Sequence, residues 1–111
     1  MRSKNMESNW SALKGYINSK NKGDIIQRKD VLEEVNKKKY LTAASFDRYC
    51  KMLNQLCILD KTWRGEYQII QHIPEGMNTV VLLNLVSKAS WKNWFMPIED
   101  QVSSYYNLKN I

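Results

Sequence analysis

The chain has 111 residues, of which 43% are hydrophobic and 25% are charged, with only four Gly and two Pro. This length allows one ordinary domain and no second core, and this composition excludes disordered, collagen-like and linker-rich proteins. The formal net charge of +6 at pH 7 makes a polyanion the first class of partner to consider.

The positive charge is concentrated in one part of the chain. Residues 1–64 hold 14 of the 17 Lys and Arg and 7 of the 11 Asp and Glu, whereas residues 65–111 hold three and four. All of the excess positive charge therefore lies in the first 64 residues. A basic part beside a near-neutral part indicates one surface that faces nucleic acid, and the alternative is a solvated, Lys-rich surface.

Neither a membrane segment nor a metal site is expected. No apolar run approaches the roughly 18–20 residues of a membrane span, and no apolar stretch follows the basic N-terminal residues, so we expect a cytoplasmic protein with no membrane partner. Cys50 and Cys57 fall inside a helical pattern, about 10 Å apart along its axis, which is too far for a disulfide. Both are expected to be small buried hydrophobic residues in a reducing compartment. One His and two Cys supply no zinc site, and no cofactor is expected.

The first elements in chain order are a helix and a short strand. We expect residues 1–8 to be flexible. From Trp10 onward, apolar residues recur at three and four positions, which predicts an amphipathic helix over about 9–19. Ile25–Ile26 is long enough only for one edge of a small sheet.

Two further helices are predicted, and a tight turn joins them. The second covers about 28–38, with Asp30 in its first turn and Lys37–Lys39 in its last, the order that the helix dipole favours. Thr42 is the expected N-cap of the third helix, which ends near 55–57. The buried stripe of the third helix is expected to consist of Phe46, Cys50 with Tyr49, Leu53, and Leu56 with Cys57.

A hairpin follows the third helix. Ile58–Leu59 and residues 67–70 are the predicted strands, and they flank residues 60–66, in which Gly65 suits a turn. Trp63, near the expected tip, either contacts a ligand or covers the hydrophobic core.

The last part of the chain is predicted to be a fourth helix and a tail. Asn78–Thr79 can cap the helix, which runs toward Phe95 and ends before Pro97. By pattern alone, residues 79–86 also fit a buried strand, and only length favours the helix. In a monomer the aromatic residues of this part, with Val102, Tyr105 and Tyr106, would fold back onto the first helix. The alternative is a homodimer contact through Trp91, Trp94 and Phe95.

The segments Ile26–Val35, Leu41–Tyr49 and Leu53–Leu59 together resemble the winged helix-turn-helix family, and more narrowly the small winged-helix proteins common in bacteriophages. The shared features are a basic residue and an Asp at the start of the second helix, a Thr/Ser-rich turn before the recognition helix, and an aromatic hairpin that ends in a stretch like Ile73–Gly76. The resemblance covers roughly residues 9–86.

The resemblance implies an α+β, mainly α fold, with a three-helix core, a small β-hairpin wing and an extra C-terminal helix. The winged-helix domain would span residues 9–76, and residues 77–111 would form the C-terminal helix and tail. Two positions depart from the family pattern. Gln27 stands where a capping Ser or Thr is usual, and Cys57 stands where a Gly commonly ends the recognition helix, so we expect a different or slightly strained turn there.

The face of the third helix opposite its buried stripe is the expected DNA-reading surface. Small residues at its leading end let the helix approach the major groove, and Ser45 can hydrogen-bond a base edge or a phosphate. Arg48 can bind guanine through two hydrogen bonds, and Gln55 can reach adenine or phosphate. The alternative for these residues, as for Lys51, is an ordinary solvated helix face.

Further cations are expected to contact the DNA backbone. Lys61 and Arg64 lie near the hairpin tip, where a wing meets the minor groove or the backbone. Two more cations, Arg28 and Lys29, lie at the start of the second helix, where free backbone N–H groups also favour phosphate. The complete set of expected DNA contacts is Arg28, Lys29, Ser45, Arg48, Lys51, Gln55, Lys61 and Arg64.

These features predict a protein that binds double-stranded DNA, sequence-specifically or generally, as a regulator or a replication or packaging factor of a phage or mobile element. An enzyme is not expected, because the sequence has no Ser/His/Asp arrangement, Gly-rich phosphate loop or carboxylate pair, and His72 fits a surface or capping role. One alternative is an adaptor for a host or phage protein, which Asp47 and the exposed-looking Met52 favour. A weaker alternative is RNA or single-stranded DNA binding on Trp63 and Tyr67.

Overall fold

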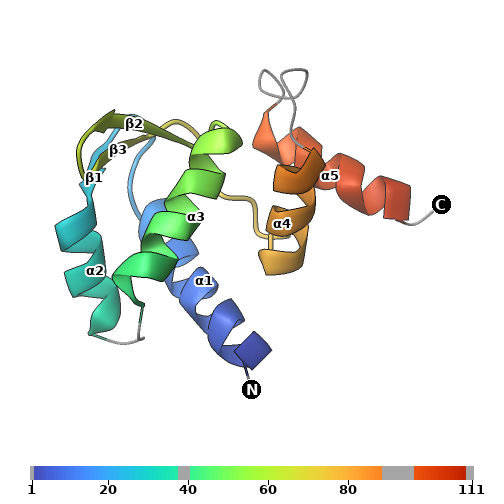
Figure 1. Cartoon of the computed structure of the whole chain (residues 1–111). Coiled ribbons are helices and arrows are strands. Elements are labelled where there is room, and N and C mark those ends of the chain that lie inside the picture. The colour runs from blue at the N-terminus through green and yellow to red at the C-terminus, as the bar shows by residue number, and fades with distance from the viewer. Residues whose placement is uncertain (1, 38–40, 89–96, 110–111) are drawn as a thin grey trace.

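The computed structural model describes the backbone of residues 2–37, 41–88 and 97–109, and the side chains of residues 9–37, 41–88 and 97–107. In these residues the fold is α+β and mainly helical (Figure 1). The three strands form one antiparallel sheet in the order β1-β3-β2. The elements in chain order are α1 (Arg2–Asn18), β1 (Ile25–Gln27), α2 (Arg28–Asn36), α3 (Ala43–Gln55), β2 (Leu59–Trp63), β3 (Glu66–Ile69), α4 (Thr79–Lys88) and α5 (Ile98–Lys109).

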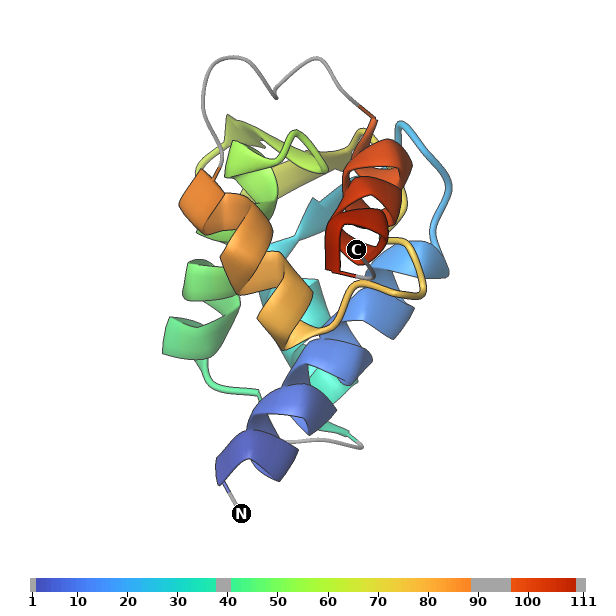
Figure 2. The ribbon, with the colours of Figure 1, turned by 90° about the vertical axis from the view of Figure 1, so that its right-hand side faces the viewer.

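Helix α3 lies at the centre of the fold. It contacts α2, β2 and α4, and Figure 1 shows it between the sheet with α2 on one side and the pair α4–α5 on the other. Helix α1 packs against both α2 and α4, and it runs beneath α3. Figure 2, turned by 90°, shows α4 and α5 in front of the remaining elements. Among the elements that the structure describes, none covers one long side of α3 and the adjoining hairpin (Figure 1).

The first two helices differ from the prediction at their ends. Helix α1 begins at Arg2 rather than near Asn9, because no Gly or Pro interrupts residues 2–14. Whether residues 1–8 are flexible stays a prediction. Helix α2 ends at Asn36 rather than Lys38, because the Asn36 side chain turns to accept a hydrogen bond from the Leu41 N–H at 2.6 Å. Residues 38–40 lie outside the described residues.

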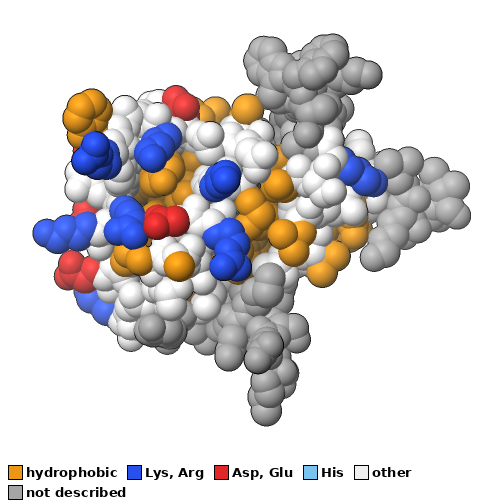
Figure 3. Space-filling view, in the orientation of Figure 1, with side chains coloured by type: hydrophobic (Ala, Val, Ile, Leu, Met, Phe, Trp, Pro, Cys, Tyr) orange, Lys and Arg blue, Asp and Glu red, His pale blue; other side chains and the backbone are white. Residues whose placement is uncertain are grey.

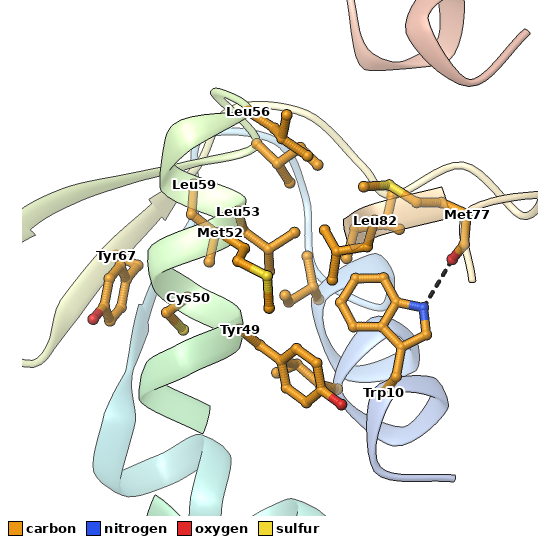
Figure 4. Close-up of a cluster of buried hydrophobic side chains, with 14 of the residues drawn as sticks. Trp10, Tyr49, Cys50, Met52, Leu53, Leu56, Leu59, Tyr67, Met77 and Leu82 are labelled. Atoms are coloured by element: carbon orange, nitrogen blue, oxygen red, sulfur yellow. Dashed lines mark hydrogen bonds between the residues drawn. The ribbon is translucent and has the colours of Figure 1, made fainter. Parts of the chain in front are cut away.

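Helix α3 starts as predicted, and its buried side is wider than predicted. The Thr42 hydroxyl accepts a hydrogen bond from the Ser45 N–H at 3.0 Å, as expected of an N-cap. The predicted residues Phe46, Tyr49, Cys50, Leu53 and Leu56 are buried, and so is Met52. Cys57, which was also expected to be buried, is only half-buried, because it lies in the turn that ends the helix. The expectation that Met52 is exposed is therefore wrong, because α4 covers this flank of α3 (Figure 4).

The end of α3 forms a tight turn that directs the chain into the hairpin. The Ile58 N–H donates to the Leu53 carbonyl at 2.9 Å, and the Cys57 N–H donates to the Asn54 carbonyl at 3.1 Å. This is the Schellman arrangement, which requires a left-handed residue at the position of Cys57. Cys57 has φ 61° and is the only non-glycine residue with positive φ among the described residues. The predicted strain at Cys57 is confirmed.

The hairpin is longer, and its connection shorter, than the sequence indicated. Strand β2 continues to Trp63 and β3 begins at Glu66, so only Arg64 and Gly65 connect them. Gly65 has φ 75°, a conformation that its missing Cβ allows. Trp63 is 72% exposed, so the alternative in which it covers the core is wrong.

Helix α1 holds the segment between β3 and α4 through three side chains spaced four residues apart on one face. The buried Trp10 Nε1 donates to the Met77 carbonyl at 2.8 Å (Figure 4). Lys14 Nζ donates to the Glu75 carbonyl at 2.9 Å. Asn18 makes two hydrogen bonds of 2.8 Å with the backbone of Ile73, one as donor and one as acceptor. These bonds fix where the chain enters α4.

Residues 79–88 form a helix. The alternative in which residues 79–86 form a buried strand is therefore wrong. The first turn of the helix is capped by Asn78, whose Oδ1 accepts from the Val81 N–H at 2.9 Å. The described part of α4 ends at Lys88. The continuation toward Phe95 and the expected dimer contact of Trp91, Trp94 and Phe95 lie outside the described residues.

A fifth helix occupies the region that the sequence indicated only as a tail. The first residue of α5, Ile98, donates its N–H to the Gln71 side chain at 2.8 Å, and α5 packs against α4. Val102 is buried, and the Tyr106 hydroxyl donates to the Gly76 carbonyl at 2.6 Å. None of the described helices is long and apolar enough to cross a membrane.

The turn at Cys57 gives a test of the fold. A left-handed conformation costs an L-residue about 1–2 kcal/mol, and a β-branched side chain tolerates it least. We expect Cys57→Gly to be at least as stable as the native chain and Cys57→Val to be less stable than Cys57→Gly by about 2 kcal/mol. Urea unfolding followed by circular dichroism measures both. Equal stability of the Gly and Val variants would contradict the turn described here.

Candidate nucleic-acid interface

One face of α3 is exposed, and it is the face that the sequence indicated. Arg48, Lys51 and Gln55 are exposed and Ser45 is half-buried. They lie opposite the buried stripe because residues three and four apart share one face of a helix. Figure 3 shows Lys and Arg side chains gathered over this side of the molecule, across the hairpin and α3, whereas apolar side chains dominate toward α4.

A groove separates α3 from the hairpin. It has a volume of about 590 Å³, and we call it the α3–hairpin groove. Its lining includes one cation from the helix, Lys51, and two from the hairpin, Lys61 and Arg64. The buried side chains of Cys50 and Tyr67 also contribute to its lining. Arg28, at the start of α2, lines it as well. Four predicted contact residues, from α2, α3 and the hairpin, therefore face one depression.

The end of α3 determines the position of the hairpin wall. The turn at Cys57 leads directly into β2, and the Asn54 side chain of the last helical turn donates to the Leu59 carbonyl at 3.0 Å. Lys61 is the cross-strand neighbour of Tyr67, whose ring makes an edge contact with Phe46, with centroids 6.1 Å apart. The cations of the hairpin are thus placed relative to α3 by packed or hydrogen-bonded groups.

Arg28 is not a free phosphate ligand as the sequence analysis expected. Its guanidinium donates two hydrogen bonds to the carboxylate of Asp47 on α3, at 2.9 and 3.1 Å. The hydrogen bond to Asp47 is the main cause that raises the pKa of Arg28 above its ordinary value. The side chains are 40% and 52% exposed, so the pair stabilises the fold by about 1 kcal/mol or less. Its larger effect is to neutralise the one acidic side chain that lines the groove.

The backbone of Arg28 also holds the hairpin. Its N–H donates to the Gly65 carbonyl at 2.8 Å, which fixes the turn against the start of α2. Lys29, the next residue, is exposed. Arg48, Gln55, Ser45 and Lys29 do not line the groove and lie on the surface outside it.

Sequence reasoning missed three residues that line the groove, Asp47, Asn54 and Tyr67. Asp47 was assigned to an adaptor surface because its partner is distant in sequence. Tyr67 was expected on an exposed sheet, but it is buried, so it offers no platform for stacked bases.

Two groups with nucleophilic atoms, Cys50 and Tyr67, line the groove. Burial raises the pKa of the Cys50 thiol to about 12 and also raises the pKa of the Tyr67 hydroxyl, so both stay protonated at neutral pH. His72 lies elsewhere, with Nε2 2.7 Å from the Lys20 carbonyl, consistent with the capping role expected. Among the described residues, no cluster of three or more His, Cys, Asp or Glu has the arrangement to hold a metal ion. What remains is a cationic, hydrogen-bonding surface.

Comparison of the chain with protein-family models, with curated proteins and with solved structures finds no match. The function of the groove must therefore be argued from its own geometry and charge.

The Arg28–Asp47 pair gives a test of the charge in the groove. Asp47→Asn keeps the size of the side chain, removes its negative charge and releases Arg28. We expect the affinity for a polyanion such as duplex DNA to rise about two- to fivefold, since one surface charge contributes about 0.5–1 kcal/mol. Fluorescence anisotropy at low salt measures the change. The control is Asp60→Asn, which removes a charge of the same sign from β2 outside the groove lining. An equal effect of both variants, or weaker binding by Asp47→Asn, would contradict this role.

Proposed function

We propose that the protein is a winged helix-turn-helix module that binds double-stranded DNA, with α3 as its recognition helix and the β2–β3 hairpin as its wing. The observation that carries the proposal is the convergence of Lys51, Lys61 and Arg64 on the α3–hairpin groove. These cations come from two elements and face the same depression, as binding to a continuous phosphate backbone requires.

The exposed face of α3 has the chemistry that a major groove needs. Ala43 and Ala44 are small and exposed at the start of the helix, so the helix can approach the base edges closely. Arg48 is exposed one turn later, and it forms no ion pair with the described residues that would hold it away from guanine. Lys51 follows one turn further on and faces the groove. Ser45 and Gln55 add hydrogen-bonding groups at either end.

The hairpin and the start of α2 supply contacts to the backbone. Lys61 and Arg64 are exposed on the hairpin, next to a turn that Arg28 holds in place. The exposed Lys29 lies near the first turn of α2, where free N–H groups and the helix dipole favour phosphate. With Arg28 neutralised by Asp47, the cations proposed to meet phosphate or bases are Lys29, Arg48, Lys51, Lys61 and Arg64.

The resemblance to small phage proteins supports a biological setting for this activity, that of a regulator or a replication or packaging factor of a phage or mobile element. Two features of the sequence favoured the alternative of a protein-interaction adaptor, and neither is found as expected. Met52 is buried, and Asp47 is bound to Arg28 rather than offered to a partner. Duplex DNA is the ligand that the exposed charges favour.

Binding to duplex DNA should depend strongly on salt. If five cations neutralise phosphates, the logarithm of the binding constant falls with a slope of about −4 to −5 against the logarithm of salt concentration. Lys51→Ala should weaken binding to all sequences and reduce the magnitude of the slope by about one, and Arg48→Ala should also reduce discrimination between sequences. Anisotropy titrations over a salt series measure both effects.

The matched control is Lys22→Ala, which removes one exposed cation beside His72 and Ile98, away from the groove. We expect it to leave duplex affinity nearly unchanged. Full duplex affinity in a double Arg48→Ala, Lys51→Ala variant that remains folded would remove the proposed function.

A further inference from the structure

The hairpin carries an exposed indole on the side that faces away from the core. Leu59 and Ile69 pair across β2 and β3 and both are buried. Because side chains alternate along a strand, Gln68 and Glu66 lie on the opposite, outer face of the sheet. Trp63 is the cross-strand partner of Glu66, so it lies on this outer face.

A register shift is what places Trp63 there. Lys61 pairs with Tyr67 and lines the groove. Residues two apart in a regular strand share a face, so a regular β2 would also direct Trp63 toward the groove side. The irregularity between Lys61 and Trp63 instead aligns Trp63 with Glu66. Such bulges redirect a side chain and are frequent near functional sites.

The indole is exposed, and the backbone that carries it is held in place. Trp63 is 72% exposed, the largest exposed fraction among the large hydrophobic residues described. Its strand pairs with β3, which also pairs with β1, and the adjoining turn is fixed by the bond from the Arg28 N–H to the Gly65 carbonyl at 2.8 Å. The backbone of the hairpin would therefore lose little conformational entropy when a flat ligand stacks on the indole.

The charges on the two faces of the hairpin differ in sign. The groove face presents Lys61 and Arg64, which attract phosphate. The outer face presents the acidic Asp60 and Glu66, each paired across the strands with Gln68 or Trp63. Phosphate is disfavoured beside these carboxylates, whereas an uncharged aromatic base is not. A nucleobase stacked on Trp63 fits the outer face better than a backbone contact does.

We propose that the hairpin binds at a junction between duplex and single strand, with the duplex backbone in the α3–hairpin groove and the first unpaired base stacked on Trp63. This inference rests on the proposed function. In a continuous duplex both faces of each base are covered, and opening a step costs a few kcal/mol, a cost that a base already unpaired avoids. Only one base would stack on the hairpin, because Tyr67 is buried and cannot offer a second aromatic surface.

The experiment compares three fluorescein-labelled probes by anisotropy at one salt concentration: a short blunt duplex, the same duplex with a single-stranded extension, and the single strand alone. We expect the native protein to bind the extended duplex at least about fivefold more tightly than the blunt duplex, from stacking on one base. Trp63→Ala should reduce this ratio to about one while blunt-duplex affinity stays nearly unchanged, and Trp63→Phe should retain most of the preference.

The control is Ile25→Ala, which removes another exposed apolar side chain from β1 and should leave the ratio unchanged. Circular dichroism establishes that each variant is folded. Equal binding of blunt and extended duplex by the native protein, or a ratio that survives Trp63→Ala, overturns the junction proposal while the proposed function stands. Absence of binding to every probe at low salt overturns both.

Discussion

Helix α3 is buried on two flanks, and this burial determines which of its side chains can meet a ligand. On one flank Cys50 lies toward Tyr67 of the hairpin, and on the other Tyr49 lies toward Trp10 of α1 (Figure 4), with ring centroids 5.4 Å apart. Burying these apolar groups is the main favourable contribution to holding α3 in place. The face left over is exposed to water, and it holds mainly polar and cationic residues with the small Ala43 and Ala44 at its start. The candidate site is thus a consequence of the core.

The second wall of the site follows from how α3 ends. The turn at Cys57 fixes the direction in which the chain leaves the helix, and the bond from Asn54 to the Leu59 carbonyl fixes the start of β2. The Arg28 N–H then holds the far end of the hairpin through Gly65. Both ends of the hairpin are therefore tied to the helices, so that its cations keep a defined position relative to α3. A groove built in this way would need little rearrangement to bind the rigid duplex that we propose as its ligand.

The features that the sequence predicted depend on local spacing. The buried stripe of α3 and the N-cap at Thr42 follow from residues within four or five positions of one another. The strain at Cys57 was expected from the resemblance, in which a Gly is usual at this position. The order of helices and strands as far as α4 could be predicted from local spacing, whereas α5 was not predicted as a separate helix. Helix ends were less accurate, as at Asn36, because a side chain there bonds to the next segment instead of continuing the helix.

The features that the sequence did not predict depend on residues far apart in the chain. Arg28 and Asp47 meet across α2 and α3, and nothing in either helix alone indicates that they pair. The sequence suggests that Met52 is exposed, but it is buried because α4 packs against α3. The direction of Trp63 depends on a shift of strand register, which a pattern of alternating residues cannot show. The sequence thus indicated the candidate surface, and tertiary contacts decided that Arg28, one of its predicted cations, is paired with Asp47.

The central claim is that α3 and the hairpin together form the surface that binds duplex DNA. Mapping of backbone amide chemical shifts during titration with a short duplex tests it most directly. We expect the largest changes in residues 43–55 and 59–66 and little change in α5. Changes concentrated on α4 and α5, with the amides of α3 unaffected, would contradict it.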